Sequence, residues 1–353
     1  HDIGSTRDND SAPQHDDNFE RSPRYFCASD DNDSVDATGD DTTHHDHAVL
    51  HQRVGSVHRL LVVMRFTVWG MSGTLLVTNP DVEQLAEETL WSWIRRADSA
   101  VNRFLPSSEI SLLNATGYLE NASDDFLEFV GAARDVAILT NGLCDPTVLR
   151  ALEAWGYDRD FDELSGELEL TESASQPSCG LDSIAIDGRH VVSPCGLDVG
   201  ASAKAHVADV IADAIEPYSG VLVELGGDVA VRTSQSEAAW TIGVAPDGPN
   251  LTAPRIDVRN GGVATSSISH RSWQTSKGRA HHIIDPRTGR PATSQWAAIT
   301  VAAPSCLLAN AFATAGFLWD DEAPWHIGQT GWAGRLVRHD GDVVTVGSWP
   351  QES

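Results

Sequence analysis

Two strand-like segments and a long amphipathic helix follow one another at the start of the apolar part of the chain. Residues 60–68 are rich in Val and roughly alternate, and 74–78 return as a second strand. Behind a cap at Asn79, apolar residues then recur every three or four positions through 82–101. Because strands and helices mix without a strict βαβ rhythm, the pattern favours an α+β fold over a doubly wound sheet.

Similar patterns continue to the end of the chain and predict one large mixed-sheet domain with flanking helices over residues 59–353. Patterns of this kind predict helices at 124–140, 207–215 and 307–317, and strands at 221–231, 240–245 and 298–303.

Residues 1–58 have a different composition. The first 50 residues hold 13 Asp and Glu against three Arg, with few apolar residues to bury. A segment of this composition cannot offset the entropy of ordering, so we expect a disordered acidic tail before the folded domain.

The whole chain is strongly acidic, with a formal net charge of -27. Such a surface repels nucleic acid and anionic lipid headgroups, so neither is an expected partner. No apolar run has the length of a membrane span. Because the first residue is His1 rather than Met, the compartment stays open between the cytoplasm and export with removal of a signal.

The five cysteines form an odd and widely spaced set without a CxxC motif, which argues against a structural zinc site. Cys179 and Cys195 flank a segment containing Gly and Pro and could pair in an oxidising compartment. The sequence leaves their pairing open.

The segment 281–289, HHIIDPRTG, holds the strongest candidate for proton transfer. His282 is a candidate general base and Asp285 a candidate carboxylate to orient it. Pro286 and Gly289 turn the chain sharply, which predicts that these polar groups lie at a rim.

Lys204 is one of only two lysines in the chain and follows the small-residue segment 198–203. Small residues at a helix start leave backbone N–H groups accessible to phosphate, and Lys204 can neutralise such a ligand. Gly226 and Gly227, within a strand-like run, suggest either a bulge or close approach of a ligand to the backbone.

Asn310 and Thr314 lie four positions apart in the predicted helix 307–317 and so share one face. Oxygen ligands at that spacing suit a hard cation such as Mg²⁺, which prefers few protein ligands plus phosphate and water. The alternative is a face of small residues that packs against a neighbour.

Taken in order, seven segments resemble the motifs of the ApbE family, the FAD:protein FMN transferases, over roughly residues 60–345. The segments are MSGT (71–74), SEISLLN (108–114), CDPTV (144–148), DVGASAKA (198–205), GGD (226–228), HIIDPRTG (282–289) and ANAFATA (309–315).

The resemblance implies an enzyme that binds FAD and Mg²⁺ and transfers FMN to a Thr or Ser hydroxyl of an acceptor protein, releasing AMP. It implies that His282 accepts the hydroxyl proton with help from Asp285, and that Phe104 stacks on a ring of FAD. The other implied positions contact the cofactor (Leu143, Cys144, Asp145, Asp198, Lys204, Gly226, Gly227, His281) or the metal (Ala201, Asn310, Thr314).

The chain departs from the family pattern where a metal-binding Asp is expected, because Asn310 stands there. An amide oxygen carries no formal charge, so Mg²⁺ affinity should fall. Two alternatives therefore stay open beside a weakened transferase: an FAD pyrophosphatase that gives FMN and AMP, and a non-catalytic FAD-binding relative.

Overall fold

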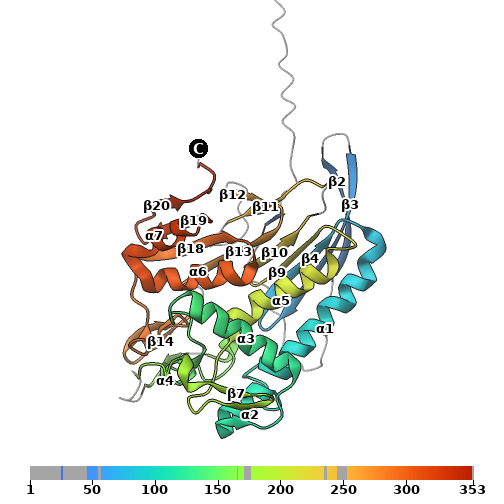
Figure 1. Cartoon of the computed structure of the whole chain (residues 1–353). Coiled ribbons are helices and arrows are strands. Elements are labelled where there is room, and N and C mark those ends of the chain that lie inside the picture. Colours follow the sequence, from blue (N-terminus) through green and yellow to red (C-terminus); the bar gives the residue numbers. More distant parts are fainter. Residues whose placement is uncertain are drawn as a thin grey trace, which may run out of the picture.

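The computed structural model describes residues 25–26, 46–54, 57–164, 166–170, 176–233, 237–244, 253–269 and 271–351. Its centre is a nine-stranded sheet of order β2-β3-β4-β9-β10-β13-β18-β19-β20, with every neighbouring pair antiparallel (Figure 1). The strands are β2 (Asp46–Val54), β3 (Val57–Val68), β4 (Met71–Val77), β9 (Val221–Leu225), β10 (Asp228–Arg232), β13 (Gly261–Ser267), β18 (Trp296–Ala303), β19 (Ala333–Arg338) and β20 (Val343–Val346).

Helices cover one face of this sheet, and a small sheet covers the other (Figure 1). Alternate residues of β3, such as Met64 and Phe66, join the core beneath the helices, whereas Leu61 and Val63 pack against the small sheet. The helices are α1 (Glu83–Val101), α2 (Glu109–Thr116), α3 (Asp124–Leu139), α4 (Leu149–Ala154), α5 (Gly200–Ile215), α6 (Cys306–Trp319) and α7 (Ala323–Gln329). This arrangement confirms the predicted α+β class.

Among the residues that the structure describes, parallel pairing occurs only in small sheets, where β1 pairs with β11 and β6 pairs with β14. These sheets have the orders β1-β11-β12, β15-β14-β6, β16-β17 and β5-β8-β7. Their strands are β1 (Tyr25–Phe26), β5 (Tyr118–Leu119), β6 (Glu167–Leu168), β7 (Ala185–Asp187), β8 (His190–Val192), β11 (Trp240–Gly243), β12 (Arg255–Val258), β14 (Ser272–Thr275), β15 (Gly278–His281), β16 (Ile284–Asp285) and β17 (Arg290–Pro291).

Most of segment 1–58, for which the sequence predicts disorder, lies outside the described residues. Within it, β1 and β2 are strands, and β2 pairs with β3 along its whole length. The central sheet therefore begins at β2, before the start of the folded domain that the sequence predicts near Arg59. Strand β2 pairs with backbone N–H and C=O groups of β3 that would otherwise be unpaired at the edge of the sheet.

Local signals explain where the main helices begin. Asn79 caps the 3-10 turn Pro80–Val82 that leads into α1, and Ser123 and Ser305 cap α3 and α6. Helix α5 starts at Gly200, so Ala201 and Lys204 belong to its first turns. This start lies within the small-residue segment where the sequence predicted a helix start, and it precedes the apolar pattern that begins at Val207, because Ala and Ser carry little amphipathic signal.

Gly226 and Gly227 do not lie inside one strand, as the run 221–231 suggested. They form the two-residue turn between β9 and β10, with φ of 59° and 90°. Both glycines take positive φ, which a tight antiparallel hairpin requires. A Cβ at position 226 would also lie 2.4 Å from Met71 Sδ, so a side chain there would collide with the neighbouring turn.

Candidate active site

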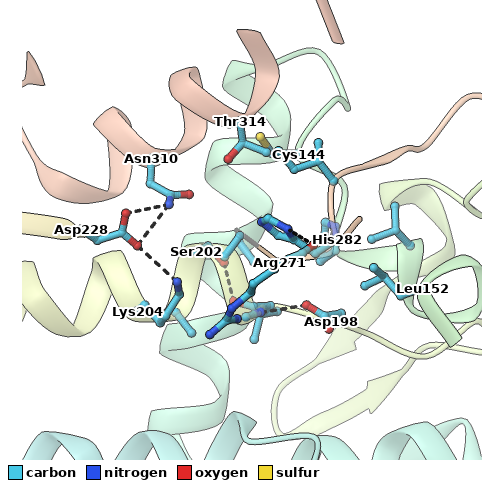
Figure 2. Close-up of a pocket in the computed structure, with 18 of the residues that line it drawn as sticks. Cys144, Leu152, Asp198, Ser202, Lys204, Asp228, Arg271, His282, Asn310 and Thr314 are labelled. Atoms are coloured by element: carbon cyan, nitrogen blue, oxygen red, sulfur yellow. Dashed lines mark hydrogen bonds and ion pairs between the residues drawn. The ribbon is translucent and has the colours of Figure 1, made fainter. Parts of the chain in front are cut away.

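A cavity of about 310 Å³ lies where the start of α5, the middle of α6 and the loop after α3 meet. Residues far apart in the sequence share its wall, including Lys204, His282 and Thr314 (Figure 2). Most of the predicted site residues line it: Phe104, Leu143, Cys144, Asp145, Asp198, Ala201, Lys204, Gly226, His282, Asn310 and Thr314.

Two buried polar side chains, Asp228 and Asn310, form a chain of contacts with the half-buried Lys204. Lys204 Nζ lies 3.7 Å from an oxygen of Asp228, and Asn310 Nδ2 donates to both Asp228 oxygens at 3.1 and 3.2 Å (Figure 2). Burial lowers the pKa of Lys204 and raises the pKa of Asp228, and each charge opposes the shift of the other. The carboxylate is thus held by one cation and one amide.

The imidazole of His282 is fixed by a backbone carbonyl. The Nδ1 atom and the backbone N–H of His282 both lie 3.3 Å from the carbonyl oxygen of Arg271. Because a carbonyl only accepts, Nδ1 carries the proton and Nε2 keeps its lone pair. Burial, followed by the charge of Arg271, lowers the pKa of His282 to about 3, so the ring is neutral near pH 7.

Asp285 does not take the predicted role of orienting His282. Its side chain accepts from the backbone N–H of Arg287 and binds the Arg287 guanidinium at 2.8 and 3.0 Å, and Asp285 is outside the cavity lining. The carboxylate closes the Pro286 turn, which satisfies it locally.

His281 and Gly227 also lie outside the lining. His281 is buried, with Nε2 3.0 Å from the carbonyl oxygen of Ala292, and it accepts from the N–H of Ile283. Gly227 donates its N–H to Glu224. Both residues therefore stabilise the backbone beside the cavity in this structure.

The donors expected for Mg²⁺ line the same cavity. Asn310 and Thr314 line the cavity one turn apart on α6, and Ala201 lines it from the first turn of α5. Because the Asn310 amide nitrogen faces Asp228, its oxygen is left for the cavity (Figure 2). Amide, hydroxyl and carbonyl oxygens fit a hard cation in type. Within the described residues, no group of three His, Cys, Asp or Glu could hold a metal.

Hydrogen bonds from Ser178 and Thr147 fix the loop that carries Cys144 and Asp145. Ser178 Oγ donates to Asp145 at 2.6 Å, and Thr147 donates to the other carboxylate oxygen through its N–H at 2.8 Å and its hydroxyl at 2.7 Å. Burial raises the pKa of Cys144 to about 12, and its thiol donates to the Ala311 carbonyl. This thiol is therefore inert rather than nucleophilic.

Ser178 itself is anchored by a disulfide between Cys179 and Cys195, which settles the pairing that the sequence left open. The Ser178 N–H also donates to the carbonyl of Pro286 at 2.8 Å. One short segment thus connects the loop of Asp145 to the turn that follows His282.

Phe104 lines the cavity, but its ring also packs inside the protein. It lies 5.8 Å from the Tyr157 ring, and the Arg103 guanidinium is 4.2 Å from the Phe104 centroid. Arg103 in turn forms an ion pair with Asp198 at 2.6 Å. These contacts fix the ring at the rim where stacking on a ligand is predicted.

Arg271 is a cavity residue that the sequence did not single out, and Asp228, the last residue of the GGD motif, was given no role in the site. Ser272 of β14 pairs with His281 of β15, so Arg271 and His282 follow on adjacent ends of one hairpin. A prediction of this hairpin from the sequence would have placed Arg271 beside His282.

Within the part of the chain described, no helix has the length and apolar character to cross a membrane.

Comparison with known proteins agrees with this architecture. The sequence model of the ApbE family matches residues 64–351. The FAD:protein FMN transferase of Haemophilus influenzae is 23% identical over 281 residues, which cover 74% of this chain and 81% of the relative. The protein of that name from Escherichia coli K12 is 24% identical over 279 residues, which cover 75% and 77%.

Solved structures give the same result for the fold. The ApbE protein of Thermotoga maritima has a TM-score of 0.71 at 24% identity, over 82% of this chain and 99% of that chain. The flavinyl transferase ApbE of Pseudomonas stutzeri has a TM-score of 0.65 at 19% identity, over 87% and 96%. Because the family model spans most of the sequence, the chain belongs to the ApbE family.

Proposed function

We propose that this protein is an FAD:protein FMN transferase that moves FMN from FAD to a Thr or Ser hydroxyl of an acceptor protein and releases AMP. The observation that carries the proposal is that His282, Lys204 and Thr314 all line one cavity, as a diphosphate site with a base requires. The names of the relatives support the same reaction.

His282 supplies the base in this proposal. With Nδ1 bonded to the Arg271 carbonyl, Nε2 is the atom that accepts the proton of the acceptor hydroxyl. A bound diphosphate adds negative charge beside Arg271 and Lys204, two of the groups that lower the pKa of His282. FAD binding therefore raises the basicity of the ring before the proton moves.

Lys204 offsets negative charge on the phosphate oxygens, and Asp228 keeps the ammonium in place at 3.7 Å. Ala201, Asn310 and Thr314 would hold Mg²⁺, which offsets charge on the diphosphate when bound. Because none of the three donors is charged, we expect weaker Mg²⁺ binding than at a site with a carboxylate.

Transfer is tested by incubating the protein with FAD, Mg²⁺ and an acceptor domain, followed by intact-mass measurement of the acceptor. We expect a mass gain of one FMN on the acceptor, lost when its target hydroxyl residue is replaced by Ala. Release of free FMN without acceptor would instead identify an FAD pyrophosphatase. FAD that stays intact in both reactions would identify a non-catalytic binding protein.

A further inference from the structure

Arg271 places a second unit of positive charge beside Lys204 in the lining of the cavity (Figure 2). Its backbone carbonyl orients His282, while its guanidinium also lines the cavity (Figure 2). One residue therefore places a positive charge and fixes the neighbouring imidazole.

The guanidinium of Arg271 has no carboxylate partner among the residues that the structure describes. The other cavity cations are matched, because Lys204 pairs with Asp228 and Arg103 pairs with Asp198 at 2.6 Å. In a chain with a net charge of -27, acidic residues to pair with Arg271 are plentiful. An unmatched guanidinium in such a cavity is an anion site.

The charge of Arg271 reaches the reacting groups. After burial, which dominates in each case, this charge is among the causes that lower the pKa values of Lys204 and His282, and it opposes the raised pKa of Asp228. Arg271, Lys204 and His282 therefore share one electrostatic environment.

We infer that Arg271 contacts the diphosphate of FAD and stabilises the phosphoryl group during transfer; the inference rests on the proposed function. In that step the acceptor oxygen forms a bond to the FMN-side phosphorus, and its proton goes to His282 Nε2. The bond from that phosphorus to the bridging oxygen breaks, and AMP leaves with the bridging oxygen and its electron pair. The planar fork of Arg271 matches two phosphate oxygens at once, which Lys204 cannot do.

The test compares binding of FAD with binding of riboflavin, which has no phosphate, in Arg271→Met. We expect FAD affinity to fall about 10- to 100-fold, the range for losing hydrogen bonds to a charged group, and riboflavin affinity to stay within about twofold. Arg271→Lys should retain part of the FAD affinity, because it keeps the charge but loses the fork. All three proteins keep the backbone carbonyl that holds His282.

Arg279→Met is the matched control, because Arg279 lies on the same hairpin, binds Ser272 and is outside the cavity lining. Its binding of both ligands should equal that of the wild type. Wild-type FAD affinity in Arg271→Met, or an equal loss for FAD and riboflavin, would overturn the inference. The binding comparison needs no acceptor protein. A wild-type protein that fails to transfer FMN would therefore defeat the proposed function without changing the conclusion that Arg271 binds the diphosphate.

Discussion

The amide of Asn310 has a structural task that the sequence comparison did not reveal. Its nitrogen donates to both oxygens of Asp228, which is 3% exposed. A carboxylate at this position would face a second buried carboxylate, and two such groups cannot both ionise without a cation between them.

In EDTA, Asn310→Asp should therefore lower the unfolding free energy by about 1–3 kcal/mol, because the hydrogen bond is lost and a repulsion is added. The loss is measured as a lower melting temperature. Mg²⁺ should restore the melting temperature of Asn310→Asp, because a divalent ion offsets both charges. FMN transfer by this variant should rise with the Mg²⁺ concentration. Asn310→Ala, which loses the bond without adding charge, is the control and should not recover with Mg²⁺. Equal Mg²⁺ responses of Asn310→Asp and the wild type would show that residue 310 does not face the metal.

His282 makes the stability of the protein depend on pH with a definite sign. Its pKa falls from 6.5 to about 3 on folding, so between these values the unfolded chain binds the extra proton. The contribution of the neutral ring is complete above pH 6.5 and is lost as pH falls towards 3.

Urea unfolding of the wild type and of His282→Asn from pH 7 to pH 4 tests this. The wild type should lose more stability on acidification, because Asn has no proton to bind. Parallel losses in the two proteins would mean that the folded pKa of His282 is close to its usual value.

At the scale of elements, the disulfide segment 176–184 links parts of the site that belong to different elements. Ser178 holds Asp145 and the carbonyl of Pro286, and Gly180 donates its N–H to Thr147. Cys195 lies shortly before Asp198, whose N–H donates to the carbonyl of Pro146. The disulfide therefore limits the motion of two cavity walls.

We expect the double variant Cys179→Ser, Cys195→Ser to lose about 3 kcal/mol of unfolding free energy, the loop-entropy value for a closed loop of this length. FAD affinity should fall as well, because Asp145 loses its anchor. A reductant should reproduce both effects in the wild type and change nothing in the double variant. A reductant effect of equal size in both proteins would place the cause elsewhere.

At the scale of the whole molecule, the chain has a net charge of -27, whereas Lys204 and Arg271 line its cavity. Repulsion of a dianionic ligand acts over about 30 Å at 0.01 M salt but only about 10 Å at 0.1 M. The association rate of FAD, measured by stopped-flow fluorescence, should therefore rise with salt over this range. A rate that falls with salt would mean that the local cations dominate at long range.

The order of motifs along the chain was enough to predict the family, the α+β class and most of the cavity wall. Period and capping signals gave α1, α3 and α6 nearly at their observed bounds. These features are local, so a single sequence contains them.

Other features depend on pairing between distant segments and could not be predicted in this way. Arg271 meets His282 only because β14 and β15 pair, and Asp285 was given a role that the Arg271 carbonyl fills. The contact between Asn310 and Asp228 needs α6 to pack beside the turn between β9 and β10. Burial, which sets the pKa of His282, also follows from the assembled fold.

The most direct test of the account follows AMP released and FMN bound to the acceptor in one reaction, with His282→Asn beside the wild type. The account predicts equal amounts of the two products at every time point, and a loss of both in the variant of about 10²-fold or more, as expected for removing a general base. AMP formed in excess of labelled acceptor, or an undiminished rate in His282→Asn, would contradict it.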